Sequence, residues 1–369
     1  MAAPLILLAA GGTGGHLFPA EALGVVLMQR GLRVRLVTDS RAIQYSGLFA
    51  DGAFDVVPSE TMRGRSPLAL LRAVSTLSLG TAKALGLVRR LKPAAVVGFG
   101  GYPTLPPLAA AYLSGVPSII HDSNAVLGRA NRLLAKRVSA IAISLPGVFD
   151  RDPSLAQKSV LTGTPLRPSV LAAADTPYQA PNTTDALRLL VVGGSQGARI
   201  MADIVPPAVE RLEPALWRRL RLVQQVREED ITRVRAVYGR LNIEVELAPF
   251  FTDLPQRLAG AHLVVSRSGA GTVAELGALG RPSILVPLPG SIDQDQFANA
   301  GVLMRAGGAI RIPQSEFTPA RLAAEISALA AEPDRLATMA IAARSVGRLD
   351  AAERLADLVM KVAKIASGT

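Results

Sequence analysis

Short apolar runs alternate with helix-length segments along most of this 369-residue chain. Such alternation is typical of βα units, whose strands pair into a parallel sheet. Strands are predicted in the first half at 4–9, 33–38, 54–57, 94–98, 117–121 and 138–143, and in the second half at 187–193, 220–226, 243–248, 262–266, 283–287 and 309–312. The pattern therefore predicts an α/β protein with two doubly wound, Rossmann-like domains.

Prolines and polar residues concentrate between the two sets of strands, in 164–186, which is predicted to be a linker. Domains are then expected over 1–163 and 187–348. The tail 349–369 is expected to form a helix that packs across the domain junction. Joined in this way, two doubly wound domains would place a cleft between the carboxyl ends of their sheets.

Composition excludes several classes of protein. The chain has no cysteine and only three histidines, so disulfides, thiolate metal sites and cysteine nucleophiles are ruled out. Residues 93–120 carry no charge, but their prolines and glycines would leave backbone groups unsatisfied in lipid, which argues against a membrane span. The first residues are typical of a core strand rather than a signal peptide, so a cytoplasmic protein is expected.

Positive charge is concentrated in the first half of the chain. Of the formal charge of +11, residues 1–163 contribute 17 Lys and Arg against 8 Asp and Glu, a net +9. This one-sided charge predicts an anionic partner, which could be a membrane surface, a phosphorylated substrate or nucleic acid. Nucleic acid is disfavoured, because only 4% of residues are aromatic and no basic-aromatic pattern for base stacking is present.

Each half opens with an apolar strand and a glycine turn, Gly11–Gly15 in the first and Gly193–Gly197 in the second. At the start of a helix, such a turn lets backbone N–H groups approach an anion. Neither turn is a nucleotide P-loop or a clean Gly-x-Gly-x-x-Gly. An NAD-dependent oxidoreductase is thereby disfavoured but stays open, since Asp39 follows the second predicted strand.

His16 directly follows the first glycine turn, at the predicted start of a helix. A helix N-terminus disfavours the cationic imidazole, which leaves the ring neutral and able to accept a proton. The alternative is a capping or packing histidine. The surrounding glycines favour the catalytic role.

The second half holds two further candidate groups. Ser266–Glu275 runs again from strand to small-residue turn to helix, which places Glu275 where its carboxylate could bind the vicinal diol of a ribose; the alternative is a solvated helix glutamate. Asp293–Gln296 supplies carboxylate and amide groups suited to sugar hydroxyls.

Seven motifs follow one another along the chain: Gly11-Gly-Thr-Gly-Gly-His-Leu-Phe-Pro, Gly100-Gly-Tyr-Pro, His121-Asp-Ser-Asn124, Gly163-Thr-Pro-Leu-Arg167, Gly193-Gly-Ser-Gln-Gly-Ala-Arg199, Ser266-Arg-Ser-Gly-Ala270 and Asp293–Gln296. In this order they resemble the MurG family of glycosyltransferases, family 28, which have the GT-B fold. The resemblance implies transfer of N-acetylglucosamine from UDP-GlcNAc to the undecaprenyl-linked muramyl-pentapeptide lipid I, which gives lipid II. It covers nearly the whole chain. The family often has His-Glu-Gln-Asn and Gly-Asn-Pro where this chain has His121-Asp-Ser-Asn and Gly163-Thr-Pro.

The same resemblance implies the roles of individual residues. The donor would be contacted by Thr13, Gly14, Gly15 and Asn124, and its diphosphate would be held by Arg167 and Ser195. The uracil would lie near Phe251, the ribose on Glu275, and the sugar hydroxyls on Gln296. The helix N-terminus facing the phosphates would comprise Ala270, Gly271, Thr272, Val273, Ala274 and Glu275.

The chemistry expected for such a transfer is inversion at the sugar carbon. His16 would act as the base for the acceptor hydroxyl, while backbone amides, helix dipoles and Arg167 would stabilise the departing UDP. No carboxylate pair such as Asp-x-Asp in a suitable loop suggests a bound divalent ion, so neither a metal nor another cofactor is expected. Cell-wall and division machinery are expected as further partners.

The segment 62–92 is a candidate membrane-facing surface. At 100° per residue, Arg72, Lys83 and Arg90 share one side, and a broad apolar arc lies opposite. The alternative is a core helix with solvated arginines. A membrane-facing segment predicts a peripheral protein on the cytoplasmic face of the plasma membrane.

Two rivals share the expected fold. A different glycolipid synthase or a UDP-GlcNAc epimerase would have a similar nucleotide-binding half but would lack the basic, apolar acceptor side.

Overall fold

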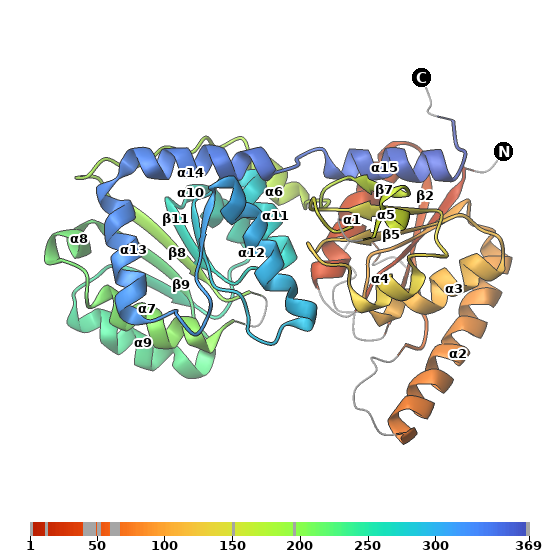
Figure 1. Cartoon of the computed structure of the whole chain (residues 1–369), viewed down its shortest axis with the longest axis horizontal. Coiled ribbons are helices and arrows are strands. Elements are labelled where there is room, and N and C mark those ends of the chain that lie inside the picture. Colours follow the sequence, from red (N-terminus) through yellow and green to blue (C-terminus); the bar gives the residue numbers. More distant parts are fainter. Residues whose placement is uncertain are drawn as a thin grey trace. The chain divides into compact units, whose positions relative to one another are not determined.

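The computed structural model describes residues 3–11, 14–39, 49, 53–59, 67–149, 152–194 and 197–366. The chain divides into two compact units, Met1–Arg167 with Leu349–Thr369, and Pro168–Arg348 (Figure 1). Each unit is built on a parallel sheet. The predicted α/β fold class with two doubly wound units is confirmed.

Among the described residues, the sheet of the first unit has seven parallel strands in the order β3-β2-β1-β4-β5-β6-β7. The strands are β1 (Leu5–Ala9), β2 (Arg33–Thr38), β3 (Phe54–Val56), β4 (Ala95–Gly98), β5 (Ser118–Asp122), β6 (Ala140–Ile143) and β7 (Ser159–Leu161). The helices are α1 (Gly14–Gln29), α2 (Pro67–Leu91), η3 (Tyr102–Thr104), α3 (Leu105–Leu113), α4 (Arg129–Leu134), α5 (Pro153–Ala156) and α15 (Ala351–Val362). Sequence reasoning missed β7, because a three-residue strand at a sheet edge gives too short a pattern.

Helices cover both faces of this sheet. Side chains alternate between the faces of a strand, and successive residues of β1 accordingly enter different cores. Ile6 and Leu8 pack in one core with residues of α1 and α15, whereas Leu5 and Leu7 pack in another with residues of α2 and α3. Burial on both faces explains why the strands appear in the sequence as short apolar runs rather than as alternating ones.

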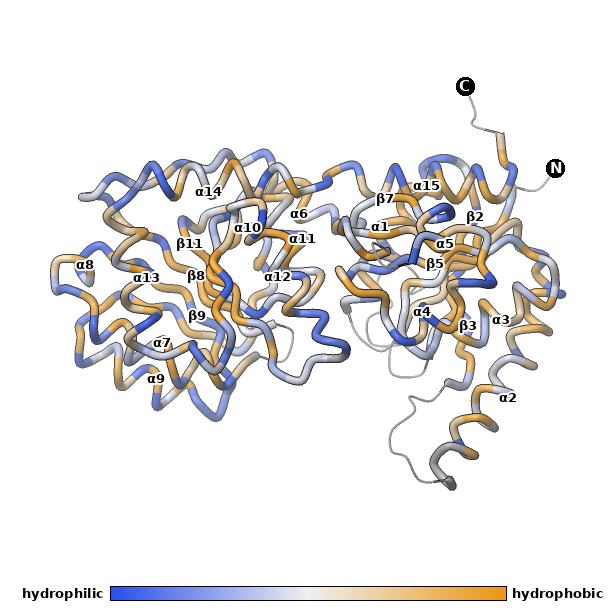
Figure 2. The backbone as a smooth tube through the Cα atoms, viewed as in Figure 1, coloured by the Kyte–Doolittle hydropathy of each residue, from blue (hydrophilic) through white to orange (hydrophobic). Residues whose placement is uncertain are grey.

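The sheet of the second unit has six parallel strands among the described residues, in the order β10-β9-β8-β11-β12-β13. The strands are β8 (Leu187–Val192), β9 (Leu220–Gln225), β10 (Val245–Ala248), β11 (Leu263–Ser266), β12 (Ser283–Leu285) and β13 (Ala309–Arg311). The helices are α6 (Pro168–Ala173), α7 (Arg199–Val209), α8 (Pro214–Arg219), α9 (Glu228–Arg240), α10 (Leu254–Gly260), α11 (Ala270–Leu279), η4 (Ile292–Gln294), α12 (Asp295–Ala306), α13 (Pro319–Ala331) and α14 (Pro333–Val346). Strands β8 and β11 run through the unit as hydrophobic segments (Figure 2).

The stretch 164–186 contains ordered structure beyond a linker. The unit boundary falls after Arg167, and α6 belongs to the second unit. Tyr178 donates its hydroxyl hydrogen to His262 O at 3.0 Å, and the buried Arg281 donates to Thr176 O at 2.8 Å. These bonds attach the segment after α6 to the second unit.

The C-terminal helix α15 packs on the first unit. Leu355, Ala356 and Val359 are fully buried in the core that also holds residues of α1. At the surface, Arg30 at the end of α1 pairs with Glu353 at 2.5 Å and with Asp357 at 2.6 Å. The last helix of the chain therefore supports α1, the helix whose first turn carries His16.

Replacing Leu355 by alanine should lower the free energy of unfolding by about 2–5 kcal/mol, because a fully buried leucine leaves a cavity when it is truncated. Urea unfolding of the intact chain measures this change. The exposed Lys361 on the same helix is the matched control, and its replacement by alanine should change the free energy by less than about 0.5 kcal/mol. Equal effects of the two variants would contradict the packing of α15 on the first unit.

Candidate functional site

The first unit has a topological switch point between β1 and β4. The chain proceeds from β1 to β2 and β3 on one side of the sheet and continues through β4 to β7 on the other. Ligands of doubly wound sheets bind at the carboxyl ends of the strands on either side of such a point. Here β1 leads into the first turn of α1, which carries His16, and β4 leads into the turn at Gly100 and Gly101.

The imidazole of His16 lies against the backbone of Gly100 and Gly101. A Cβ atom at Gly100 would lie 3.3 Å from His16 Cε1, and one at Gly101 would lie 3.5 Å from His16 Cδ2. Both glycines have positive φ, +90° and +75°, in the left-handed region that favours glycine. The turn after β4 thus forms a surface without side chains on which the ring rests.

Burial lowers the pKa of His16 below its usual value. The nearby Asp122 carboxylate and a hydrogen bond with the backbone of Phe99 act in the opposite direction and offset part of this effect. The imidazole is therefore neutral at pH 7, the state in which it can accept a proton. This agrees with the direction expected from the sequence, although desolvation is the largest cause.

A second histidine, His121, lies fully buried at the end of β5. Its Nε2 is 3.0 Å from Gly163 O, so this nitrogen carries the hydrogen and donates it. Ser144 Oγ is 3.1 Å from the same nitrogen, and the ring of Phe99 packs at 5.3 Å between centroids. Burial lowers the pKa of His121 as well. The bond to Gly163 O ties the end of β5 to the segment that leads to Arg167.

Asp122 organises the loop that contains Asn124. Its carboxylate accepts hydrogen bonds from Asn124 N at 3.0 Å, Gly128 N at 2.8 Å and Asn131 Nδ2 at 2.9 Å. Asn131 Nδ2 also donates to His121 O at 3.0 Å. The sequence indicated Asn124 but not Asn131, whose position on α4 gave no motif to find it by.

Arg167 lies over the ring of Phe18, with 4.5 Å between its Cζ atom and the ring centroid. The same ring stands close to the glycine turn, since a Cβ atom at Gly14 would be 2.9 Å from Phe18 Cε2. Phe18 thus brings together two sequence-predicted elements, the glycine turn and Arg167. A cation over an aromatic face is stabilised by about 0.5–1 kcal/mol at an exposed site.

The second unit has its own switch point between β8 and β11. β8 leads into the turn at Gly193 and Gly194, and β11 leads through Gly269 into α11. The N-cap residue of α11, Gly269, has no side chain to cap the helix, and the first-turn N–H groups and the positive end of the helix dipole favour an anion at this position. Residues Ala270–Glu275, predicted to face the phosphates, form the first part of this helix.

The turn after β8 is possible only with glycine. A Cβ atom at Gly193 would lie 2.1 Å from Ala198 N, closer than any real Cβ contact. Gly193 N donates to Gln225 Oε1 at 2.9 Å, and Gln225 Nε2 donates to Pro249 O at 3.1 Å. Gln225, at the end of β9, was not found from the sequence, yet it joins the glycine turn to the loop that precedes Phe251.

Phe251 is buried, with the guanidinium of Arg257 stacked on its ring at 4.4 Å. The preceding residue, Phe250, is 63% exposed. Both follow β10, at the carboxyl edge of the sheet. Phe250 therefore offers the free aromatic surface in this loop, and sequence reasoning passed over it in favour of its neighbour.

Gln296 lies at the start of α12, where its side chain is partly committed to the fold. Its Oε1 accepts a hydrogen bond from Leu288 N at 3.0 Å, which closes the loop after β12. Only the Nε2 group is then available to donate to a sugar oxygen. Thr13 and Ser195 lie outside the described residues.

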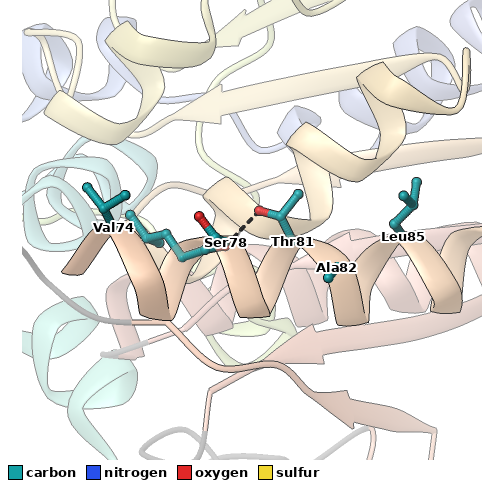
Figure 3. Close-up of a pocket in the computed structure, with 6 residues that line it drawn as sticks. Val74, Ser78, Thr81, Ala82 and Leu85 are labelled. Atoms are coloured by element: carbon teal, nitrogen blue, oxygen red, sulfur yellow. Dashed lines mark hydrogen bonds between the residues drawn. The ribbon is translucent and has the colours of Figure 1, made fainter. Parts of the chain in front are cut away.

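A helical surface of the first unit forms a further candidate site. On α2, Ala73, Ala84, Leu87 and Val88 are buried, whereas Leu71 and Leu79 are 67% and 68% exposed. A groove along the helix is lined by Val74, Leu77, Ser78, Thr81, Ala82 and Leu85 (Figure 3). The predicted apolar arc thus divides into a packed part and an open part. Among the described residues, no helix is long and apolar enough to cross a membrane.

Two doubly wound units, each with a glycine turn at the switch point of its parallel sheet, are the architecture of the GT-B class. The chain belongs to glycosyltransferase family 28. The profile of the glycosyltransferase family 28 N-terminal domain matches residues 6–143, and that of the C-terminal domain matches residues 188–355.

Close relatives share nearly the full length of the chain. A protein of Nitrobacter hamburgensis named UDP-N-acetylglucosamine–N-acetylmuramyl-(pentapeptide) pyrophosphoryl-undecaprenol N-acetylglucosamine transferase is 73% identical over 364 residues, covering 99% of this chain and 98% of the relative. The equally named protein of Bradyrhizobium diazoefficiens is 74% identical over 360 residues, covering 98% of each. The crystal structure of Acinetobacter baumannii MurG has a TM-score of 0.79 at 29% identity and covers 97% of this chain and 99% of that one. The chain is therefore a glycosyltransferase.

Proposed function

We propose that the chain transfers N-acetylglucosamine from UDP-GlcNAc, with inversion, to the muramyl 4-hydroxyl of undecaprenyl-pyrophosphoryl-MurNAc-pentapeptide, lipid I. The product is lipid II, used in peptidoglycan synthesis. The observation that carries this proposal is 73% identity over 99% of the chain with a transferase named for this donor and acceptor. The neutral histidine at one switch point and the helix N-terminus at the other provide chemistry that fits the reaction.

In this proposal the second unit holds the donor. The first turn of α11 donates backbone N–H groups to the diphosphate, and Glu275 accepts hydrogen bonds from the ribose hydroxyls. The uracil lies at the loop of Phe250 and Phe251, and Gln296 Nε2 donates to the sugar. Ser195 completes the diphosphate contacts.

The first unit provides the base. As the acceptor oxygen forms its bond to the anomeric carbon, His16 takes the hydroxyl proton, and the electrons of the breaking bond pass to the UDP oxygen. Arg167 and the amides of α11 stabilise the charge that develops on the diphosphate. Thr13, Gly14, Gly15 and Asn124 contact the donor from the glycine turn and the Asp122 loop.

Transfer of labelled N-acetylglucosamine from UDP-GlcNAc to a short-chain lipid I analogue tests the proposed function. We expect a labelled disaccharide lipid with inverted configuration at the anomeric carbon. Conversion of UDP-GlcNAc to its 2-epimer without an acceptor, or transfer to another lipid in preference to lipid I, would contradict the proposal.

Replacing His16 by alanine should lower the rate of the chemical step by roughly 10²–10⁴-fold, the usual contribution of a general base, with little change in donor affinity. Single-turnover kinetics and UDP-GlcNAc titrations separate the two effects. Because the neutral imidazole is the active form and burial lowers its pKa, the wild-type rate should fall only as the pH drops below about 6.5, the ordinary histidine value.

The His16→Ala variant should lack this fall in rate at acidic pH. A His16→Gln variant, which keeps a polar side chain of similar size, should behave as the alanine variant does. If His16→Ala instead lowers thermal stability and donor affinity together while turnover persists, His16 has a packing role and is not the base.

We also propose that α2 binds the cytoplasmic face of the plasma membrane. Arg72, Lys83 and Arg90 follow one side of the helix, since positions 7 and 11 residues apart lie within about 40° of one another on a helix. The exposed Leu79, seven residues after Arg72, offers apolar surface on this side, whereas the groove lies on the opposite side of the helix. Such a surface suits an anionic leaflet.

Replacing Arg72, Lys83 and Arg90 by glutamine should weaken binding to anionic phosphatidylglycerol vesicles, because attraction of roughly 1 kcal/mol per basic residue is removed. Co-sedimentation at low and high salt measures the effect, while UDP affinity should stay unchanged. The matched control replaces Arg218, Arg235 and Arg348, exposed arginines of the second unit, by glutamine. Equal vesicle binding by both triple variants would show that α2 is not the membrane surface.

A further inference from the structure

Arg267 joins two loops at the carboxyl edge of the second unit. It follows β11, and only 8% of its surface is exposed. Its Nη1 donates to Val286 O and to Pro287 O, both at 3.1 Å, and its Nη2 donates to Gln314 Oε1 at 2.6 Å. The side chain therefore spans from the turn that opens α11 to the loop after β12.

The partners of this guanidinium are uncharged. Within the described part of the chain, no carboxylate forms an ion pair with Arg267, and burial lowers its pKa from the usual arginine value. A buried charge without a counter-ion is costly unless hydrogen bonds satisfy it. Three of its five N–H groups meet acceptors in a fixed fork, and this geometry holds the two carbonyl groups at defined positions.

Further bonds complete the connection between the two loops. Ser268 Oγ donates to Gln296 O at 2.8 Å, and the fully buried Asn299 donates from Nδ2 to Ser268 O at 3.2 Å. Gln296 Oε1 in turn accepts from Leu288 N at 3.0 Å. The turn 267–269, the segment 286–288 and the start of α12 thus form one hydrogen-bonded body.

We propose that Arg267 is a positioning residue for donor-sugar recognition. This inference rests on the proposed function, in which α11 holds the diphosphate and Gln296 contacts the sugar. The position of the diphosphate then depends on the turn after Gly269, and the position of the sugar contact depends on the loop that ends at Gln296. Arg267 fixes the distance between these two groups without touching the donor itself.

A direct role in phosphate binding is disfavoured by the same geometry. Both hydrogens of Nη1 and one of Nη2 are directed at protein acceptors. An arginine that bound a phosphate would present its paired N–H groups to that ligand.

Replacing Arg267 by methionine tests the proposal, because methionine keeps an unbranched apolar stem and introduces no buried charge. We expect UDP affinity, measured by titration calorimetry, to stay within about threefold. The preference in kcat/KM for UDP-GlcNAc over its 4-epimer UDP-GalNAc should fall roughly 10- to 100-fold, the loss expected when hydrogen bonds to a charged group are removed.

Gln314→Leu is the second variant, and it serves if Arg267→Met does not fold. It removes one acceptor of the fork and should lower the same preference by a smaller factor. Arg321→Met, which removes a half-exposed arginine from α13, is the control and should change neither quantity.

Two results would overturn the proposal. A parallel loss of UDP affinity and of UDP-GlcNAc activity in Arg267→Met would make Arg267 a phosphate ligand. If neither Arg267→Met nor Gln314→Leu changes the sugar preference, Arg267 has only a packing role. Failure of the wild-type chain to use UDP-GlcNAc would refute the proposed function. This outcome differs from a failure of the Arg267 proposal, because the wild-type chain is measured before any variant.

Discussion

Burial of the strands on both faces is the constraint on which the rest of the structure depends. A strand such as β1, whose alternate side chains enter two separate cores, has no side that can carry polar chemistry. Functional groups can then stand only where strands end, and in a parallel sheet all carboxyl ends meet at one edge. His16, Gly100, Gly193 and the start of α11 all lie just beyond such ends.

Turning from a strand into a helix at this edge brings backbone into close contact with backbone. At Gly193 a Cβ atom would overlap Ala198 N, and at Gly100 it would press on the imidazole of His16. Glycine is required at Gly193 by this overlap and is favoured at Gly100 by a φ of +90°, while Gly193 N–H is itself used in a hydrogen bond to Gln225. Because a glycine turn before a helix also suits an anion, structural need and anion binding favour the same residue, and a glycine turn by itself is weak evidence for function.

The sequence predicted the regular elements well and the loops less well. Twelve strands were placed within two residues of their observed ends, since apolar runs buried on both sides are a strong signal. Phe251 and Gln296 were predicted as site residues from the family resemblance, which did not indicate their surroundings. Phe251 is covered by Arg257, and half of the Gln296 amide is used inside its own loop. Such details depend on contacts between residues distant in the chain, for which one sequence has no local pattern.

Three buried residues whose role the sequence did not indicate act in the same physical way. Gln225, Asn131 and Arg267 are buried polar side chains that bond to backbone groups or carboxylates of neighbouring loops. A loop at a sheet edge has few apolar contacts to fix it, so its geometry comes from hydrogen bonds, which are directional and costly to leave unmade in the interior. The geometry of the loops at this edge is therefore fixed by the hydrogen bonds of buried side chains. A sequence motif can contain such a residue, as Ser266–Ala270 contains Arg267, but its role becomes visible only when the hydrogen bonds of each loop are traced to their donors.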